Sequence, residues 1–147
     1  MRWCFVDRVE SYLEWESITA LKAVSFEEFH LLEKQGRQGE LPESLLLETC
    51  IEALRWLIVR SSAFQLLSTL HSVEAFKIFT PARCGDVLRL TVTVENRSSD
   101  HVSAFCTVLC PRADLAEGKI SVETMPMDLS IDPSLLRGTW KELHGKA

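Results

Sequence analysis

The sequence predicts an α+β fold in which a long antiparallel sheet curls around one central buried helix. The chain has 147 residues, which is enough for one domain with a substantial core. The segment 42–62 is apolar on nearly its whole circumference, so a helix there needs other structure on every side. Segments that alternate between apolar and polar residues precede and follow this helix, as expected for strands.

The residues before the helix predict two strands. Residues 3–24 mix aromatic and β-branched side chains with polar ones, and we place a turn at Glu16 and Ser17. In the second strand Ile18 and Ala20 fall on one face because successive side chains alternate across a strand. A two-stranded hairpin is therefore expected at the start of the chain.

The connection to the central helix contains a local helix signal and a loop signal. Ser25 followed three residues later by Glu28 forms a capping-box pattern, which predicts a short helix over residues 25–34. Residues 35–40, with two glycines, have the composition of a loop.

The central helix is expected to start near Pro42 and to end near Ser62. Proline suits the first turn of a helix, where its missing N–H removes no hydrogen bond, and Glu43 places negative charge near the positive end of the helix dipole. The apolar positions are Leu45, Leu46, Leu47, Cys50, Ile51, Ala53, Leu54, Trp56, Leu57 and Ile58.

Three or more strands are expected after the helix, and AFQLLSTLHSVEAFKIF leads into them. The clearest is RLTVTVENR, in which Leu90 and Val92 share one face, and RSSD at residues 97–100 predicts a hairpin turn before the returning strand HVSAFCTVLC. LAEGKISVETM is a further strand candidate, whereas residues 126–147 carry no pattern that we could assign. One helix wrapped by such a sheet is the hotdog fold, and we expect residues 1–147 to form a single hotdog domain.

Bulk composition excludes several classes of function. The net charge of −5 and the absence of a Lys/Arg cluster argue against nucleic-acid binding. Glu48, Glu52 and Arg55 interrupt the most apolar segment, so no transmembrane helix is expected. Five cysteines without metal-ligand spacing indicate reduced, mostly buried thiols and no metal site. With no signal peptide in the sequence, these features predict a cytoplasmic protein.

Three stretches of the chain match, in the same order, the motifs of one known family. FVDRV at residues 5–9 is similar to that family's opening strand. LPESLLLETCIEAL at residues 41–54 is similar to MPGVLIIEALAQ at the start of its central helix. FKIFTPARCGDVLRLTV at residues 76–92 is similar to its strand F-R-R-P-V-x-P-G-D-x-L. By these stretches the chain resembles the FabZ/FabA-type 3-hydroxyacyl-[acyl-carrier-protein] dehydratases, and the resemblance covers about residues 5–125.

The resemblance implies a hotdog fold and a fatty-acid-type biosynthetic enzyme, a lyase of lipid metabolism. It implies substrates that are thioesters of acyl carrier protein, with coenzyme A thioesters as the other carrier. It also implies a homodimer or higher oligomer whose active sites lie between subunits, and no metal or redox cofactor. Each family site combines a loop histidine with a helix carboxylate from the partner.

Carrying the family site onto this sequence gives a mixed result. Glu48 falls on the catalytic acid of the helix, and Pro42 is retained. A count without gaps places Lys34 at the position of the catalytic histidine and Glu43 at the glycine that opens the helix. The candidate catalytic residues are therefore Glu48, Lys34 and a nearby His30, and the candidate substrate-binding residues are Pro42 and Glu43.

The substitution of lysine for histidine changes the expected chemistry. Dehydration needs a base for the α-proton and an acid for the departing hydroxyl. A lysine with an ordinary pKa of about 10.4 is protonated at neutral pH and serves as a base only if its surroundings lower that value. His30 lies four residues before Lys34 and would share a helix face with it, so it is the other candidate base.

Two functions remain open on the sequence alone. The first is an atypical dehydratase that uses Glu48 and has Lys34 at the histidine position, with a thioesterase as a less favoured variant. The second is a non-catalytic acyl-chain or carrier-binding relative, or a partner subunit that forms a heteromer with an active paralogue. Glu48 also has a structural reading, as part of a polar stripe with Glu52 and Arg55.

Overall fold

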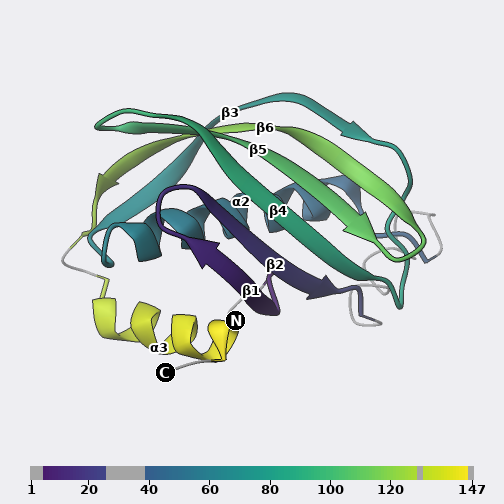
Figure 1. Cartoon of the computed structure of the whole chain (residues 1–147), viewed down its shortest axis with the longest axis horizontal. Helices are drawn as coiled ribbons and strands as arrows, with labels where there is room; N and C mark the ends of the chain where they lie inside the picture. The colour runs from purple at the N-terminus through teal and green to yellow at the C-terminus, as the bar shows by residue number, and fades with distance from the viewer. Residues whose placement is uncertain (1–4, 26–38, 129–130, 146–147) are drawn as a thin grey trace.

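The computed structural model describes residues 5–25, 39–128 and 131–145. Within these residues six strands form one antiparallel sheet in the order β1-β2-β4-β5-β6-β3 (Figure 1). The strands are β1 (Arg8–Leu13), β2 (Ser17–Ala23), β3 (Leu66–Ile78), β4 (Val87–Arg97), β5 (His101–Cys110) and β6 (Ala113–Pro126). The helices are α2 (Glu43–Ser61) and α3 (Pro133–His144). The predicted short helix lies outside the described residues except for Ser25.

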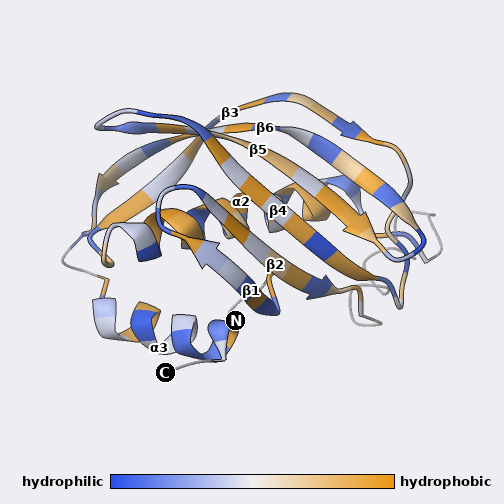
Figure 2. Cartoon of the chain, viewed as in Figure 1, coloured by the Kyte–Doolittle hydropathy of each residue, from blue (hydrophilic) through white to orange (hydrophobic). Residues whose placement is uncertain are grey.

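The sheet curls around α2, so the predicted α+β architecture is confirmed (Figure 1). The expected alternation is visible along β4 and β5, where hydrophobic and hydrophilic positions follow one another (Figure 2). Leu88, Leu90 and Val92 of β4 are fully buried on the inner face. Ile18 and Ala20 of β2 are buried beside them, as the sequence predicts, because β2 and β4 pair directly.

The central helix is enclosed on most of its sides. Its buried residues include Leu46, Cys50, Ile51, Ala53, Leu54, Trp56, Leu57, Ile58 and Val59. The helix begins at Glu43, and Pro42 is the residue just before it, one position earlier than the first turn we expected. The Pro42 carbonyl accepts hydrogen bonds from the backbone N–H groups of Leu45 and Leu46 at 3.0 and 3.1 Å. The Pro42 carbonyl thus gives hydrogen-bond partners to backbone N–H groups in the first turn of the helix.

The first hairpin turns earlier than the sequence suggested. The turn occupies residues 14–16, and Ser17 already belongs to β2. Trp15 adopts a left-handed backbone with φ of 58°, a conformation that closes three-residue hairpin loops. The guanidinium of Arg97 lies 4.2 Å from the centre of the Trp15 ring. This cation–π contact helps to hold a non-glycine residue in an otherwise unfavourable conformation.

The 13-residue strand β3 forms one edge of the sheet and is irregular. Its pairing with β6 shifts register twice, between Leu70 and Ser72 and between Glu74 and Lys77. Ala75, inside the second irregularity, has φ of 50°. Bulges of this kind twist a strand locally. In the described part of the chain, the outer edge of β3 pairs with no other strand and remains open to a partner.

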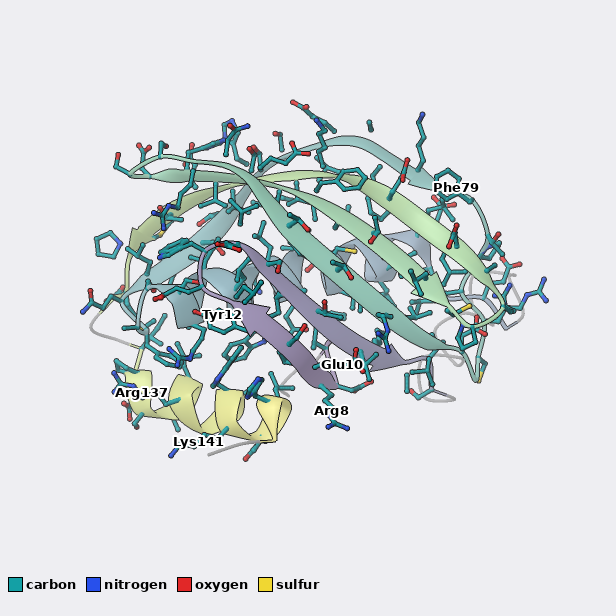
Figure 3. All side chains as sticks on the ribbon, viewed as in Figure 1. Arg8, Glu10, Tyr12, Phe79, Arg137 and Lys141 are labelled. Atoms are coloured by element: carbon teal, nitrogen blue, oxygen red, sulfur yellow. The ribbon has the colours of Figure 1, made fainter. Side chains whose placement is uncertain are left out.

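The C-terminal tail, for which we had no assignment, contains α3. Asp132 caps its start by accepting a hydrogen bond from the Ser134 N–H at 2.9 Å, and Gly145 ends it in a left-handed conformation. Trp140 and Leu143 are buried, and α3 packs against β1 (Figure 3). The Trp140 ring also meets the Trp56 ring of α2, with 6.2 Å between the ring centres.

Gly118 of β6 is predicted to be intolerant of any side chain. A Cβ atom there would lie 2.7 Å from both the Cα and the Cδ2 of Phe76, so the backbone of β3 would have to move. We expect Gly118→Ala to lower the free energy of unfolding by about 1–3 kcal/mol, measured by urea denaturation.

The control is Gly138→Ala in α3, where an added Cβ would meet no atom within 4 Å. It should leave stability unchanged or raise it by up to about 1 kcal/mol, since alanine is the better helix former. Equal effects of the two substitutions would contradict the close approach of β3 to Gly118.

Candidate functional site

Glu48 is an exposed carboxylate on a mostly buried helix. Ser44, Glu48 and Arg55 are exposed and follow one side of α2, because positions four and seven residues apart share a helix face. Among the described residues, no cation lies within ion-pair distance of Glu48. The Glu48 carboxylate is therefore available on the one side of α2 that the chain's own sheet leaves uncovered.

Glu52, which the polar-stripe reading paired with Arg55, has a different role. Its Oε2 accepts hydrogen bonds from the backbone N–H groups of Phe5 and Val6, at 2.6 and 2.9 Å. Its side chain is buried, and loss of water raises the pKa of the carboxyl above its usual range, although these hydrogen bonds oppose the change. Within the described residues, no salt bridge joins Glu52 to Arg55. Glu52 thus attaches the start of the first hairpin to α2.

The turn between β3 and β4 holds the beginning of α2. The Leu41 N–H donates to the Ala82 carbonyl at 2.7 Å, and the Cys84 N–H donates to the Gly39 carbonyl at 3.0 Å. Gly85, in the stretch FKIFTPARCGDVLRLTV, has φ of 92°, a conformation that glycine adopts more readily than other residues. Two of the family-like stretches are thus in contact. The turn in residues 76–92 holds the start of the helix in residues 41–54.

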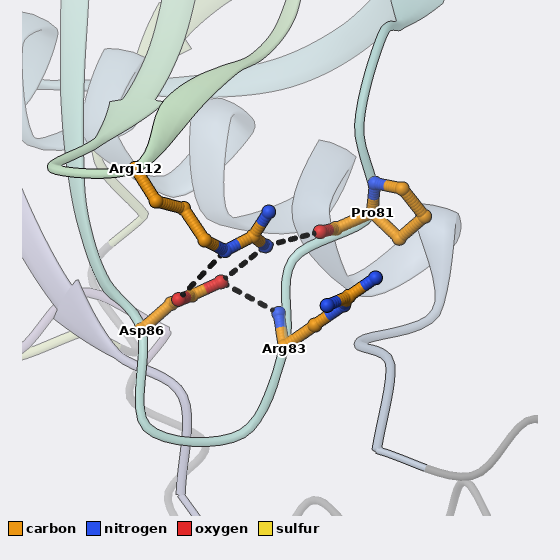
Figure 4. Close-up of polar contacts among 4 residues, drawn as sticks. All are labelled: Pro81, Arg83, Asp86 and Arg112. Atoms are coloured by element: carbon orange, nitrogen blue, oxygen red, sulfur yellow. Dashed lines mark hydrogen bonds and ion pairs between the residues drawn. The ribbon is translucent and has the colours of Figure 1, made fainter.

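Asp86 closes this turn (Figure 4). Its Oδ2 accepts from the Arg83 N–H at 2.8 Å and from the Arg112 guanidinium at 2.7 Å. Arg112 also donates to the Pro81 carbonyl at 2.7 Å, which links the two ends of the turn. The bond with Arg112 holds the pKa of the Asp86 carboxyl below its usual value, and the Arg83 N–H adds to the effect.

Of the site residues predicted from the sequence, three lie in the described part of the chain. Pro42 is buried at the start of α2, Glu43 is exposed in its first turn, and Glu48 follows five residues later. Lys34 and His30 lie outside the described residues. The predicted helix carboxylate and helix start are therefore placed, whereas the loop side of the site stays a prediction.

Lys22 lies on the inner face of β2 with Ile18 and Ala20, the face on which the alternation of the sequence places it. It is only 2% exposed and faces inward from the end of β2. Two residues later the Val24 N–H donates to the Asp86 carbonyl oxygen at 2.9 Å, so Lys22 lies near the turn that holds the start of α2. The sequence indicates that Lys22 faces inward, because side chains alternate along a strand and Lys22 is in step with Ile18 and Ala20.

Metal and thiol chemistry receive no support in the described part of the chain. No group of three His, Cys, Asp or Glu side chains there could hold a metal ion. Cys50, Cys84, Cys106 and Cys110 are free thiols, and all but Cys84 are buried. Neither described helix combines the length and the hydrophobicity that crossing a membrane would require.

Comparison with known proteins identifies the family. No protein-family model matches the chain. The chain is 31% identical over 104 residues to the 3-hydroxyacyl-[acyl-carrier-protein] dehydratase FabZ of Levilactobacillus brevis, which covers 70% of each protein. The chain belongs to the FabZ family. This agrees with the resemblance seen in the three quoted stretches.

Solved structures show that this FabZ-family chain has the hotdog fold. A hot-dog-like protein from Thermanaerovibrio acidaminovorans superposes with a TM-score of 0.68 at 18% identity, over 92% of this chain and 96% of that one. A hypothetical thioesterase from Streptococcus pneumoniae, solved with coenzyme A, superposes with a TM-score of 0.65 at 10% identity, over 82% and 86%. The predicted fold class is confirmed.

The contact between Asp86 and Arg112 should make stability fall in acid. Because the folded state lowers the Asp86 pKa, the stabilisation is present above the unfolded value of about 3.9 and is lost as pH falls through the folded value. Asp86→Asn should lower the free energy of unfolding by about 1–2 kcal/mol at pH 7 and by less at pH 3. Urea denaturation at both pH values measures this, with Asp114→Asn as the control. An equal loss at pH 3 and pH 7 would contradict the ion pair.

Glu52 should make the free energy of unfolding change with pH in the opposite direction and at higher pH. Because the folded state raises the Glu52 pKa, it binds the proton more readily than the unfolded chain does. Stability should therefore rise as pH falls from the raised folded value towards the unfolded value of about 4.3. Glu52→Gln should remove this rise. If denaturation curves between pH 7 and pH 4.5 changed equally in wild type and variant, the buried carboxyl would not be its source.

Proposed function

We propose that this protein handles 3-hydroxyacyl and enoyl thioesters of acyl carrier protein as an atypical dehydratase, with Glu48 as the site carboxylate. The observation that supports this most is the position of Glu48. It aligns with the family's catalytic acid, and it stands on the uncovered side of a buried, rigid helix. A carboxylate on such a scaffold can be held accurately against a substrate.

The proposed reaction removes water from a 3-hydroxyacyl thioester. A base takes the α-proton, the C–O bond at C3 breaks, and an acid gives its proton to the departing hydroxyl, which leaves as water. Glu48 is proposed as the acid. Lys34 or His30 would be the base that takes the α-proton. Lys34 can take it only if its surroundings lower its pKa. Pro42 and Glu43 would line the substrate's path at the start of α2.

We further propose that the protein is a homodimer, as in its family. The open edge of β3 offers unpaired backbone groups along 13 residues, and the uncovered side of α2 carries Glu48. A second copy joined along β3 would extend the sheet. The carriers expected are acyl carrier protein or coenzyme A, and the coenzyme A bound by the Streptococcus pneumoniae thioesterase fits an acyl-thioester ligand. A cytoplasmic location stays a prediction.

The alternative function is a non-catalytic relative that binds the acyl carrier or completes an active paralogue in a heteromer. Lys34 at the histidine position and Glu43 at the glycine position favour it. Glu43 adds negative charge near the place where an enolate-like transition state would form, which opposes its stabilisation. Thioester hydrolysis is a further variant because thioesterases share the fold.

The test is turnover of purified protein with 3-hydroxyacyl and enoyl thioesters of acyl carrier protein. Wild type should catalyse their interconversion, and Glu48→Gln should lower the rate by at least about 100-fold. Glu14→Gln, an exposed acid in the first hairpin turn, is the matched control and should keep full activity. Lys34→Ala and His30→Ala test the two candidate bases. The variant that loses turnover identifies the base.

The other outcomes separate the alternatives. Binding of the acyl carrier without turnover would contradict the dehydratase and support the non-catalytic reading. Release of free carrier thiol that depends on Glu48 would indicate a thioesterase. No binding of either carrier by the folded protein would contradict both proposals.

A further inference from the structure

A pocket of about 520 Å³ lies between the last turn of α2, strand β1 and α3. Three aromatic side chains, Tyr12, Phe64 and Trp140, and three cationic ones, Arg60, Arg137 and Lys141, line it. Figure 3 shows Tyr12 on β1 above α3, which carries Arg137 and Lys141. The volume is within the range of small-molecule sites, roughly 300–1,000 Å³.

This pocket is separate from the proposed thioester site. Glu48 lies in the second turn of α2, whereas Arg60 lies in its last turn. At about 1.5 Å of rise per residue, the two positions are roughly 18 Å apart along the helix. The other cationic residues come from α3, which belongs to the tail beyond the family resemblance. The inference therefore does not rest on the proposed function.

The aromatic walls are held in place by one another. The Tyr12 and Trp140 rings meet edge to face with 5.5 Å between their centres, and the His144 ring stacks on Trp140 at 5.3 Å. The Tyr12 hydroxyl lies 3.3 Å from the Ser61 hydroxyl at the end of α2. Phe64 and Trp140 are buried, with 8% and 7% of their surface exposed, whereas Tyr12 is only partly buried. The Tyr12 ring is therefore the aromatic surface that a ligand can reach, and a ring already held in place needs little further ordering on binding.

Within the described part of the chain, no acidic side chain pairs with the cations of the pocket. Arg60 lies 5.6 Å from the centre of the Tyr12 ring, and Arg137 lies 5.2 Å from the centre of the Phe64 ring. Among the described residues, no carboxylate forms an ion pair with Arg60, Arg137 or Lys141. In a chain of net charge −5, three such cations around one pocket create a local site for an anion.

Some other cations of the chain form ion pairs. Arg89 pairs with Glu10 at 3.3 Å, and Arg112 pairs with Asp86 at 2.7 Å. The cations of the pocket are distinguished by their convergence on one cavity. Guanidinium groups offer planar donors that match phosphate and carboxylate oxygens.

We propose that this pocket binds a small anion with a flat aromatic body. The phosphate or carboxylate group is held by Arg60, Arg137 and Lys141, and the aromatic body lies beside the partly exposed Tyr12 ring. The volume of the pocket favours a small molecule. A metal ion is disfavoured because its charge has the same sign as the lining.

The experiment is isothermal titration calorimetry on the full chain with 1-naphthyl phosphate, naphthalene-1-carboxylate and neutral 1-naphthol. Wild type should bind at least one of the anions more tightly than naphthol, and the order of the two anions identifies the preferred group. The double variant Arg137→Gln/Lys141→Gln should weaken binding of the preferred anion by about 10- to 100-fold, the loss expected for charged hydrogen bonds. It should leave the affinity for naphthol unchanged.

The control is Arg83→Gln, an exposed cation in the turn at the other end of α2, which should leave all affinities unchanged. Arg137 and Lys141 are exposed, so the double variant should unfold at the wild-type temperature, and circular dichroism checks this. Three results would overturn the proposal: no binding of either anion at millimolar concentration, equal affinity for the preferred anion in wild type and double variant, or a larger loss in Arg83→Gln. Loss of acyl-carrier-protein binding with unchanged anion affinity would instead assign the cations to a protein-docking surface.

Discussion

The structure depends on the enclosure of α2. A helix with apolar side chains on nearly all sides is stable in water only if other structure covers it, and the sheet does this by curling along its length. The segment just before β1 is joined to the helix by the bonds of Glu52 to the backbone of Phe5 and Val6. The turn closed by Asp86 fixes the start of the helix, and the Trp140 ring of α3 meets the Trp56 ring near its end.

The same enclosure explains why the polar exceptions on α2 matter. A carboxylate in a buried helix has to be exposed or hydrogen-bonded, because unpaired burial of a charge is costly. Glu52 meets this requirement through backbone N–H groups and becomes a structural group with a raised pKa. Glu48 meets it by exposure on the uncovered side of the helix. The two acids lie only one turn apart, so their different surroundings separate a structural role from a proposed chemical one.

The sequence predicted the parts of the fold that follow from periodicity and from local turn chemistry. The alternation of Leu88, Leu90 and Val92 and the all-round apolar pattern of the helix were sufficient to place β4 and α2. The role of Glu52 was missed because its partners lie 46 and 47 residues away, where no local pattern connects them. Trp15 was missed because a left-handed turn residue is usually glycine or asparagine.

Helix α3 carried start and stop signals at Asp132, Pro133 and Gly145 that we did not combine. The aromatic and cationic pocket could not have been predicted, because its lining comes from β1, the end of α2 and α3, which only the fold brings together. For the candidate site, the sequence placed Glu48 on the central helix, where the structure has it, whereas its catalytic role stays a prediction. The partnership of Glu48 with Lys34 or His30 remains a prediction, since both lie outside the described residues.

The most direct test of the central claim is a crystal structure of the protein with an enoyl-pantetheine amide, in which an amide replaces the reactive thioester. The account predicts that the ligand's C3 lies close to the Glu48 carboxylate, at about hydrogen-bonding distance for a hydroxyl on that carbon. It also predicts that the pantetheine arm passes the start of α2. A ligand bound elsewhere, with Glu48 still facing solvent, would contradict the assignment of this helix as the functional centre.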